Sequence, residues 1–163
     1  MTTSTMWIAV AAIAIAGAAR ADDPSAMKNK AVFTNAKDLK WMPAMPDLPK
    51  GMAMAVLYGD PSKPGMYAVR LEMPDGYKIP PHWHSQDEQL TVLEGTFVLH
   101  MGDTMKSEPH ELDVGGYHFL PAKMHHGAEA KGGTTIVQVQ GMGPFDIHYV
   151  NPADNPNPKA ASK

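Results

Sequence analysis

Two histidines and a glutamate are spaced so that together they could bind a metal ion. One residue separates His82 from His84, and side chains two positions apart on a β-strand point to the same face. Glu88 follows a short loop, residues 85–87, and can approach the same point from the next strand. Two imidazoles and a carboxylate that converge in this way form a facial site for a divalent metal.

Proline and glycine restrict the backbone on both sides of these residues. Pro80 and Pro81 precede the first histidine and fix the chain direction there. Gly95 follows the glutamate by seven positions, in the segment Leu93-Glu94-Gly95-Thr96. We expect this glycine to permit a tight turn that joins two separate strands within residues 89–101.

The same segment resembles the first signature motif of the cupin superfamily. That motif reads Gly-x5-His-x-His-x3-Glu-x6-Gly. This chain matches its five fixed positions with Gly76, His82, His84, Glu88 and Gly95. A match at every fixed position is far more specific than any single histidine would be. The chain is therefore similar to the small single-domain cupins of bacteria.

A second motif of the same family, Gly-x5-Pro-x-Gly-x2-His-x3-Asn, matches in part. Gly115, Pro121 and His126 occupy their expected positions, whereas Lys123 replaces the second glycine and Ala130 replaces the asparagine. The resemblance implies that His126 is the fourth metal ligand. The adjacent His125 is its rival, but neighbouring strand residues point to opposite faces, so only one of the two can bind the ion.

The resemblance thus implies one divalent transition metal held by three imidazoles and a carboxylate. Such a ligand set suits Fe²⁺, Mn²⁺, Ni²⁺ or Zn²⁺ and leaves open positions for water, substrate or dioxygen. Glu88 is also a candidate catalytic base, a role that some cupins give to this glutamate.

Further polar residues are candidates for binding a substrate. Arg70 could hold an anionic group, with a surface or ion-paired position as the alternative. Gln138 alternates with valines, so it faces either the metal cavity or solvent. His118 could serve near the ion or be an ordinary strand residue.

The elements that must position these residues are predicted to be short strands. Apolar runs separated by Gly, Pro, Asn and Asp recur along the chain, and no long helical period follows residue 21. Expected strands cover residues 52–58, 66–73, 116–121, 126–130, 134–140 and 145–150, besides the pair within 89–101. This spacing predicts an all-β fold, and the resemblance narrows it to a small antiparallel jelly-roll barrel.

Composition excludes several classes of protein. The chain of 163 residues carries 14 Lys and Arg against 17 Asp and Glu, a balance that gives no reason to expect a nucleic-acid partner. Cysteine is absent, which excludes disulfides, thiolate metal ligands and cysteine nucleophiles.

The two ends of the sequence differ from its centre. Residues 1–21 contain an apolar run that ends in Ala19-Arg20-Ala21, as in a secretory signal peptide. We therefore expect a periplasmic or secreted protein with no stable membrane insertion after cleavage; an uncleaved anchor is the alternative. An N-terminal extension (22–50), the barrel domain (51–150) and a flexible tail (151–163) complete the predicted organisation.

Function is predicted only at the level of the site. The first hypothesis is a divalent-metal-dependent enzyme with dioxygenase-like chemistry on a small organic molecule. A metal-dependent isomerase or lyase and a non-catalytic periplasmic binding or sensing protein are the alternatives. We also expect a homodimer, because cupin barrels often pair through an edge strand and an open edge is a liability.

Overall fold

The computed structural model describes residues 31–157 of the chain. The predicted signal peptide, residues 1–21, and the end of the predicted tail, residues 158–163, lie outside this range. Within it, two short 3₁₀ helices, η2 (Ala36–Asp38) and η3 (Pro152–Asp154), accompany nine strands. No helix in the described part of the chain is long and apolar enough to cross a membrane.

The described strands are all joined by antiparallel pairing, which confirms the predicted antiparallel all-β fold. Their bounds are β1 (Met42–Pro43), β2 (Ala53–Tyr58), β3 (Gly65–Met73), β4 (Lys78–Trp83), β5 (Glu88–Met101), β6 (Pro109–Leu112), β7 (Tyr117–Leu120), β8 (His126–Gly143) and β9 (His148–Tyr149).

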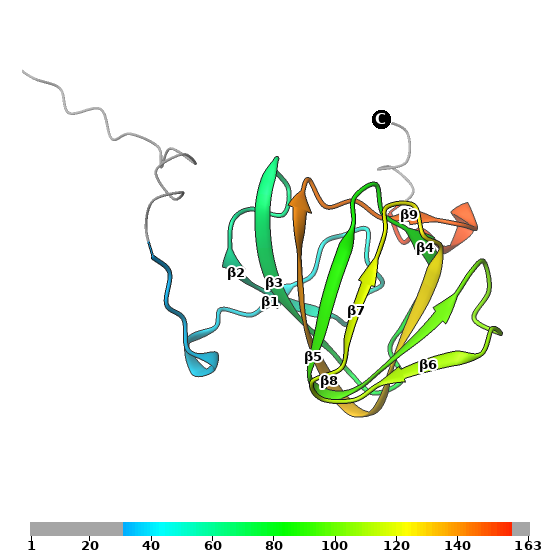
Figure 1. Ribbon diagram of the computed structural model, residues 1–163, viewed down its shortest axis with the longest axis horizontal. Coiled ribbons are helices and arrows are strands. Elements are labelled where there is room, and N and C mark those ends of the chain that lie inside the picture. Colours follow the sequence, from blue (N-terminus) through cyan, green and yellow to red (C-terminus); the bar gives the residue numbers. More distant parts are fainter. Residues whose placement is uncertain (1–30, 158–163) are drawn as a thin grey trace, which may run out of the picture. The chain divides into compact units, whose positions relative to one another are not determined.

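Two long strands organise this sheet. The first half of β8 pairs with β4 and with the end of β5, and its second half pairs with β3 and with the start of β5. The hairpin partners β6 and β7 lie along the other edge of β5. Figure 1 shows β5 and β8 bending together, so that the sheet curls into two arms that open at the end near β4 and β9.

The bend in β5 corrects the prediction of two strands joined by a turn. β5 is one strand of 14 residues whose pairing with β8 shifts in register between Val92 and Thr96. Gly95 lies inside this irregularity with φ of 71°, and a Cβ atom there would stand 2.6 Å from the Thr134 carbonyl oxygen. The glycine therefore allows β5 to bend where β8 approaches it closely, and the chain does not turn back into a second strand.

The core fills the concave side of the curled sheet. On β3, Tyr67, Val69, Leu71 and Met73 are buried and alternate with more exposed residues, the period expected of a strand with one face inward. Inward positions on the two longest strands contribute further core residues: Leu90, Val92, Phe97, Leu99, Ala128, Ala130, Val137 and Val139.

Both flanking segments are partly anchored to the barrel. β1 pairs with β2, and Leu48 belongs to the core, so the latter part of the predicted extension belongs to the folded domain. At the other end, the Asn157 amide donates to Asp47 Oδ1 at 2.9 Å. The first residues of the predicted flexible tail are therefore ordered against the N-terminal segment.

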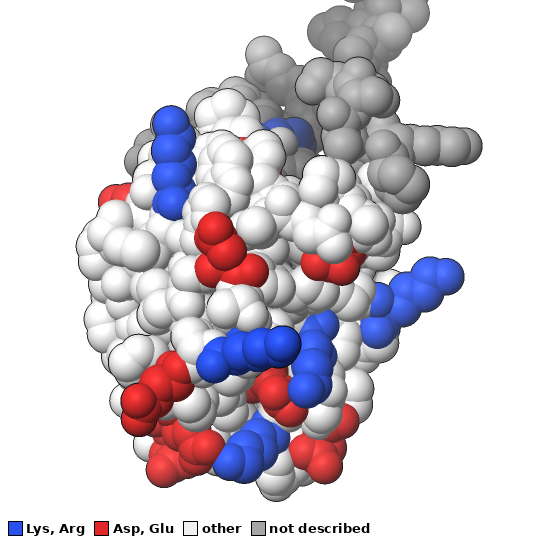
Figure 2. All heavy atoms as spheres, turned by 90° about the vertical axis from the view of Figure 1, so that its right-hand side faces the viewer, with Lys and Arg blue, Asp and Glu red and all other residues white. Residues whose placement is uncertain are grey.

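Surface charge on one face of the domain is mixed in sign. Figure 2 shows Lys and Arg side chains interleaved with Asp and Glu, with neither sign forming a continuous patch on the face in view. Ion pairs such as Lys131 with Glu111 at 2.5 Å and Lys78 with Glu129 at 3.2 Å join strands at the surface.

Candidate metal centre

Three histidines, on or next to β4 and β8, converge inside the barrel. His82 lies on β4, His84 follows the end of that strand, and His126 is the first residue of β8 and the pairing partner of His82. One nitrogen from each ring lies within 4.8 Å of the others, and the three side chains are 2%, 7% and 2% exposed. Three buried imidazoles that close together form a site that can hold a metal ion.

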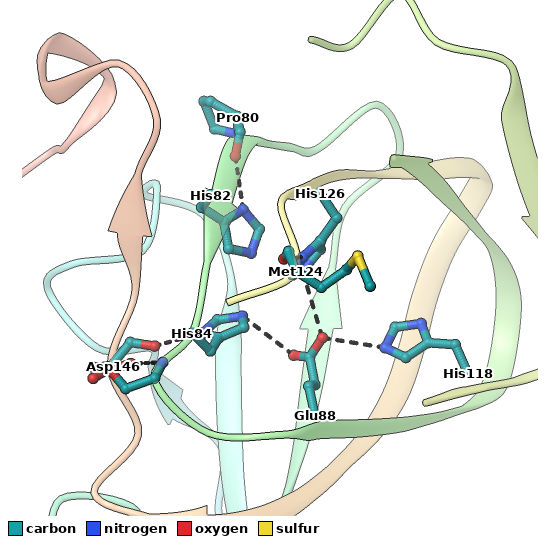
Figure 3. A network of polar contacts seen from close by, with 9 residues as sticks. Pro80, His82, His84, Glu88, His118, Met124, His126 and Asp146 are labelled. Carbon is teal, nitrogen blue, oxygen red and sulfur yellow. Dashed lines mark hydrogen bonds and ion pairs between the residues drawn. The ribbon is translucent and has the colours of Figure 1, made fainter. Parts of the chain in front are cut away.

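The tautomer of each ring follows from its second nitrogen. The Nδ1 atom of His82 donates to the Pro80 carbonyl, that of His84 to the Asp146 carbonyl and that of His126 to the Met124 carbonyl (Figure 3). Because a carbonyl oxygen can only accept, each Nδ1 carries the proton. Each Nε2 is therefore unprotonated and has a lone pair available for a metal ion. The Nδ1 hydrogen bond fixes the orientation of the ring, as is usual for a metal-binding histidine.

Electrostatics keep these rings available as ligands. Burial lowers the pKa of His82 well below its ordinary value, and the neighbouring His126 and His84 lower it further. Burial also lowers the pKa of His126, against the opposing effect of the Glu88 carboxylate. Both rings are thus neutral at physiological pH, the state that coordinates a metal.

An unpaired nitrogen supports the same assignment. His84 Nε2 is buried and has no hydrogen-bond partner among the described residues. A buried polar atom without a partner costs free energy, so its retention needs an explanation. A metal ion shared with the other two Nε2 atoms supplies one, and the donor set therefore fits a divalent transition metal.

Glu88 contacts the histidine cluster from the first residue of β5. One carboxylate oxygen, Oε1, lies 3.6 Å from His84 Nε2, and the other, Oε2, lies 3.5 Å from His126 Nε2. His118 on β7 donates from Nε2 to Oε2 at 3.2 Å. Figure 3 shows the carboxylate between His84, His126 and His118, on the side of the cluster away from Pro80.

The charge state of Glu88 results from opposing effects. Burial raises the pKa of its carboxyl, but His84 and the hydrogen bond from His118 outweigh burial and lower the pKa below its ordinary value. An ionised carboxylate at this position can serve as a metal ligand or accept a proton.

The rival histidine and the tryptophan between His82 and His84 point away from the cluster. His125 is 39% exposed at its side chain, and its Nδ1 lies 2.5 Å from Asp103 Oδ1. Trp83 stacks on His148 of β9 with 4.0 Å between ring centroids. The alternation expected of strand residues therefore holds on both sides of the centre.

Two of the predicted substrate-binding residues lie outside the site. Arg70 and Gln138 are cross-strand partners on β3 and β8. Their neighbours Val69, Val137 and Val139 face the core, so both side chains lie on the opposite face of the sheet. Arg70 is partly buried there, and its Nε atom is buried without a hydrogen-bond partner among the described residues, whereas His118 does reach the centre.

A small pocket, open to solvent, adjoins the cluster on the side of Glu88. Its cavity volume is about 10 Å³, which is room for about one water molecule, so a larger ligand would extend from the pocket into solvent. Sequence reasoning missed most of its walls, because they come from β3 and the segment after β8. Its lining consists of Tyr67, His84, Gln86, Asp87, Glu88, Met142, Pro144, Phe145 and Asp146.

Fold and site together define this chain as a cupin. Its sequence matches the DUF4437 family, described as a domain of unknown function, over residues 13–147. The chain therefore belongs to the DUF4437 family. No curated protein sequence matches it.

Solved structures with the same fold include enzymes. The polyketide cyclase RemF from Streptomyces resistomycificus is 20% identical with a TM-score of 0.67, and the match covers 81% of this chain and 94% of that chain. A structure of the DMSP lyases RdDddP and RnDddQII is 18% identical with a TM-score of 0.55, and the match covers 71% of this chain and 64% of that chain. An RmlC-like cupin from Shewanella frigidimarina is 17% identical with a TM-score of 0.53, and the match covers 68% of this chain and 88% of that chain. At these identities the likeness concerns the fold.

Proposed function

We propose that this chain is an exported, divalent-metal-dependent enzyme that acts on a small organic molecule, with dioxygenase-like chemistry as the first candidate. The convergence of three buried imidazoles beside an open pocket carries the proposal. His82, His84 and His126 would hold the ion, with Glu88 as the fourth ligand. A metal bound there would act as a Lewis acid or bind dioxygen next to the substrate.

The protein's own residues would divide the remaining work. Glu88 lines the pocket, so once released from the ion it would be placed to accept a proton from a bound molecule. His118 holds that carboxylate in place through its Nε2 hydrogen. Phe145 and Met142 give the pocket apolar walls that reduce the access of water to the site.

A non-oxidative reaction is the second candidate, and the comparisons favour it. A polyketide cyclase and DMSP lyases share the fold, and cyclisation and elimination need a Lewis acid and a base without an oxidant. A periplasmic binding or sensing protein without catalysis is the third possibility, for which the pocket alone would suffice.

Metal content is the first test. The full-length protein, purified without chelator and loaded with Fe²⁺ or Zn²⁺, should bind one ion per chain. His84→Ala should lose that ion, whereas His125→Ala, which changes an exposed neighbour of the cluster, should retain it. Absence of metal from the loaded wild-type protein would contradict the proposed centre.

Turnover then separates the candidates. Iron-loaded protein is supplied with phenols, diketones and carboxylic acids while dioxygen uptake and product are followed. Uptake that depends on substrate and is lost in His84→Ala supports the dioxygenase. Conversion by the zinc form without oxygen supports a lyase or isomerase. Ligand recovered unchanged from a metal-loaded protein supports the binding protein.

Export and self-association complete the proposal. The apolar run before residue 22 supports export, and the mass of the mature N-terminus in a secreting host would test it. Exposed apolar side chains on β3, β7 and β8, among them Met66, Tyr117, Phe119 and Met142, support a homodimer. Sedimentation would decide between monomer and dimer.

A further inference from the structure

Tyr67 lines the pocket with a hydroxyl that has no assigned role in the protein. The side chain is 4% exposed and projects from the inner face of β3. Its ring packs edge-on against Phe145, with 6.4 Å between centroids. The hydroxyl makes no hydrogen bond to any residue that the structure describes, yet it is not enclosed, because it borders the pocket.

Two other tyrosines of the barrel, the buried Tyr77 and the partly buried Tyr149, show how differently Tyr67 is used. The Tyr77 hydroxyl donates to the Pro49 carbonyl, and the Tyr149 hydroxyl donates to the Asp47 carbonyl. Both tie the N-terminal segment to the barrel. Since buried phenols ordinarily find a partner, the free hydroxyl of Tyr67 indicates a partner that is supplied from the pocket.

A glycine keeps the space around this hydroxyl open. Gly141 of β8 is the pairing partner of Tyr67, and its φ lies outside the left-handed region, so backbone conformation does not require glycine there. A Cβ atom at that position would lie 3.3 Å from the Tyr67 hydroxyl and 3.2 Å from the Asp87 carbonyl oxygen. The missing side chain thus leaves room beside the Tyr67 hydroxyl.

The charges around the pocket restrict what that ligand can be. Asp87, Glu88 and Asp146 contribute carboxylates, and none of the lining residues is Lys or Arg. Three carboxylates outnumber the charge of one divalent ion, so an additional anionic group would be repelled. The apolar walls from Met142, Pro144 and Phe145 suit a hydrocarbon body.

We propose that Tyr67 is a ligand-binding residue whose hydroxyl donates a hydrogen bond to an oxygen of an uncharged, oxygen-bearing small molecule. This role rests on the metal centre proposed above and adds the substrate class to it. Burial and the charges of Glu88 and Asp146 raise the pKa of Tyr67, so the phenol keeps the proton that it donates.

Binding of two matched probes to the zinc-loaded, full-length protein tests this assignment without turnover. Catechol and 3,4-dihydroxybenzoate carry the same diol, so their interaction with an ion is shared, and they differ by one carboxylate. Titration calorimetry at neutral pH should show the wild-type protein binding catechol about tenfold or more tightly than the carboxylated probe.

Two substitutions then isolate the hydroxyl. Tyr67→Phe should weaken catechol binding about three- to tenfold, as loss of one hydrogen bond predicts, with zinc content unchanged. Gly141→Ala should also weaken it, by crowding the hydroxyl. Tyr77→Phe removes another buried phenol, one that does not line the pocket, and should bind catechol as the wild type does.

The outcomes distinguish the two levels of the proposal. A wild-type protein that binds no zinc contradicts the metal centre itself. A fully loaded protein that binds neither probe, or prefers the carboxylated one, contradicts the ligand class alone. Equal catechol affinity in wild type and Tyr67→Phe, at equal zinc content, overturns the role of the hydroxyl.

Discussion

The Glu88 carboxylate meets the His126 imidazole at 3.5 Å, although the two residues stand at opposite ends of the paired strands β5 and β8. Straight strands would separate these ends, since 14 extended residues span about 40 Å. Figure 1 shows that β5 and β8 bend together, which removes that separation. Gly95 lies in the register irregularity between their two halves. The metal centre therefore depends on a residue that contacts none of its ligands.

Gly95→Ala should accordingly be among the most destabilising substitutions in the barrel. The new Cβ would lie 2.6 Å from the Thr134 carbonyl oxygen and 2.6 Å from Thr135 Oγ1, at a φ of 71°. We expect a loss of about 3 kcal/mol or more in the free energy of unfolding, measured by urea denaturation. Metal binding should fall with it.

Gly132→Ala provides the matched control for this prediction. Its φ is 76°, but nothing lies within 4 Å of the added Cβ. It should therefore show the conformational cost alone, about 1 kcal/mol. Equal losses for the two variants would mean that close approach of β8 has no energetic role.

The hydrogen bond from His118 to Glu88 should tune metal affinity. His118→Leu removes the donor that holds Oε2, and loss of such a supporting contact typically weakens metal binding about 10- to 100-fold. His118→Gln, which keeps an N–H donor, should recover part of the affinity. Competition with a chromophoric chelator measures both.

His100→Leu is the control for this experiment. His100 is as buried as His118, at 8% exposure each, but its Nδ1 contacts the Ser107 carbonyl outside the centre. Its metal affinity should equal that of the wild type. A His118→Leu protein with unchanged affinity would place Glu88 outside the ligand set.

Stability of the metal-free protein should fall in mild acid. His82 and His126 have pKa values below the ordinary 6.5 in the folded state, chiefly because of burial. The unfolded chain therefore binds protons that the folded chain excludes, so stability is full above pH 6.5 and declines as the pH falls below it. The slope approaches about 1.4 kcal/mol per pH unit for each histidine.

Urea denaturation of chelator-treated protein between pH 8 and pH 5.5 measures this decline. The lowered pKa of Glu88 adds its own loss only near and below its ordinary value of 4.5, outside this window. Replacing His82 and His126 together by Gln should flatten the profile. A flat wild-type profile would show that the buried rings do not exclude protons.

Lys123 offers a stabilising substitution. It is the one non-glycine residue with a positive φ, 65°, in the described part of the chain, and it stands where the second cupin motif has glycine. Its backbone N–H still donates to the His84 carbonyl at 2.8 Å, so the turn next to the centre is intact. Lys123→Gly should raise stability by about 1 kcal/mol, seen as a higher Tm.

Lys123→Ala tests whether that gain comes from the backbone. Alanine removes the charge and the long side chain but keeps the Cβ that disfavours this conformation. It should therefore leave Tm near the wild-type value. A gain in the alanine variant equal to that of Lys123→Gly would assign the effect to the side chain.

Sequence reasoning located the histidine cluster because spacing on a strand fixes the face of a side chain. His82, His126 and the outward His125 follow from that rule and from the motif spacing. The same rule could not decide whether Gln138 faced the cavity or solvent, since alternation defines two faces without saying which is inside. The structure resolves the question through the burial of Val137 and Val139.

The pocket and the bend in β5 could not be predicted from the sequence for a different reason. Tyr67 and Gly141 are neighbours only through the register of β3 with β8, across more than seventy residues of sequence. Gly95 has the local signature of a turn, and only the close approach of Thr134 shows that it serves a continuous strand. The local sequence indicates that the backbone changes direction, but only the pairing with a distant strand decides whether that change is a turn between two strands or a bend within one.

The folded strand pair also has a consequence for how the protein assembles. Each arm of the pair contributes part of the centre, Glu88 from one and His126 from the other, with His82 joined to the second through β4. Neither arm folded alone could coordinate an ion with this geometry. An ion bound to the site would cross-link the two arms at the open end of the barrel. Metal uptake during refolding would therefore show when the two arms have come together.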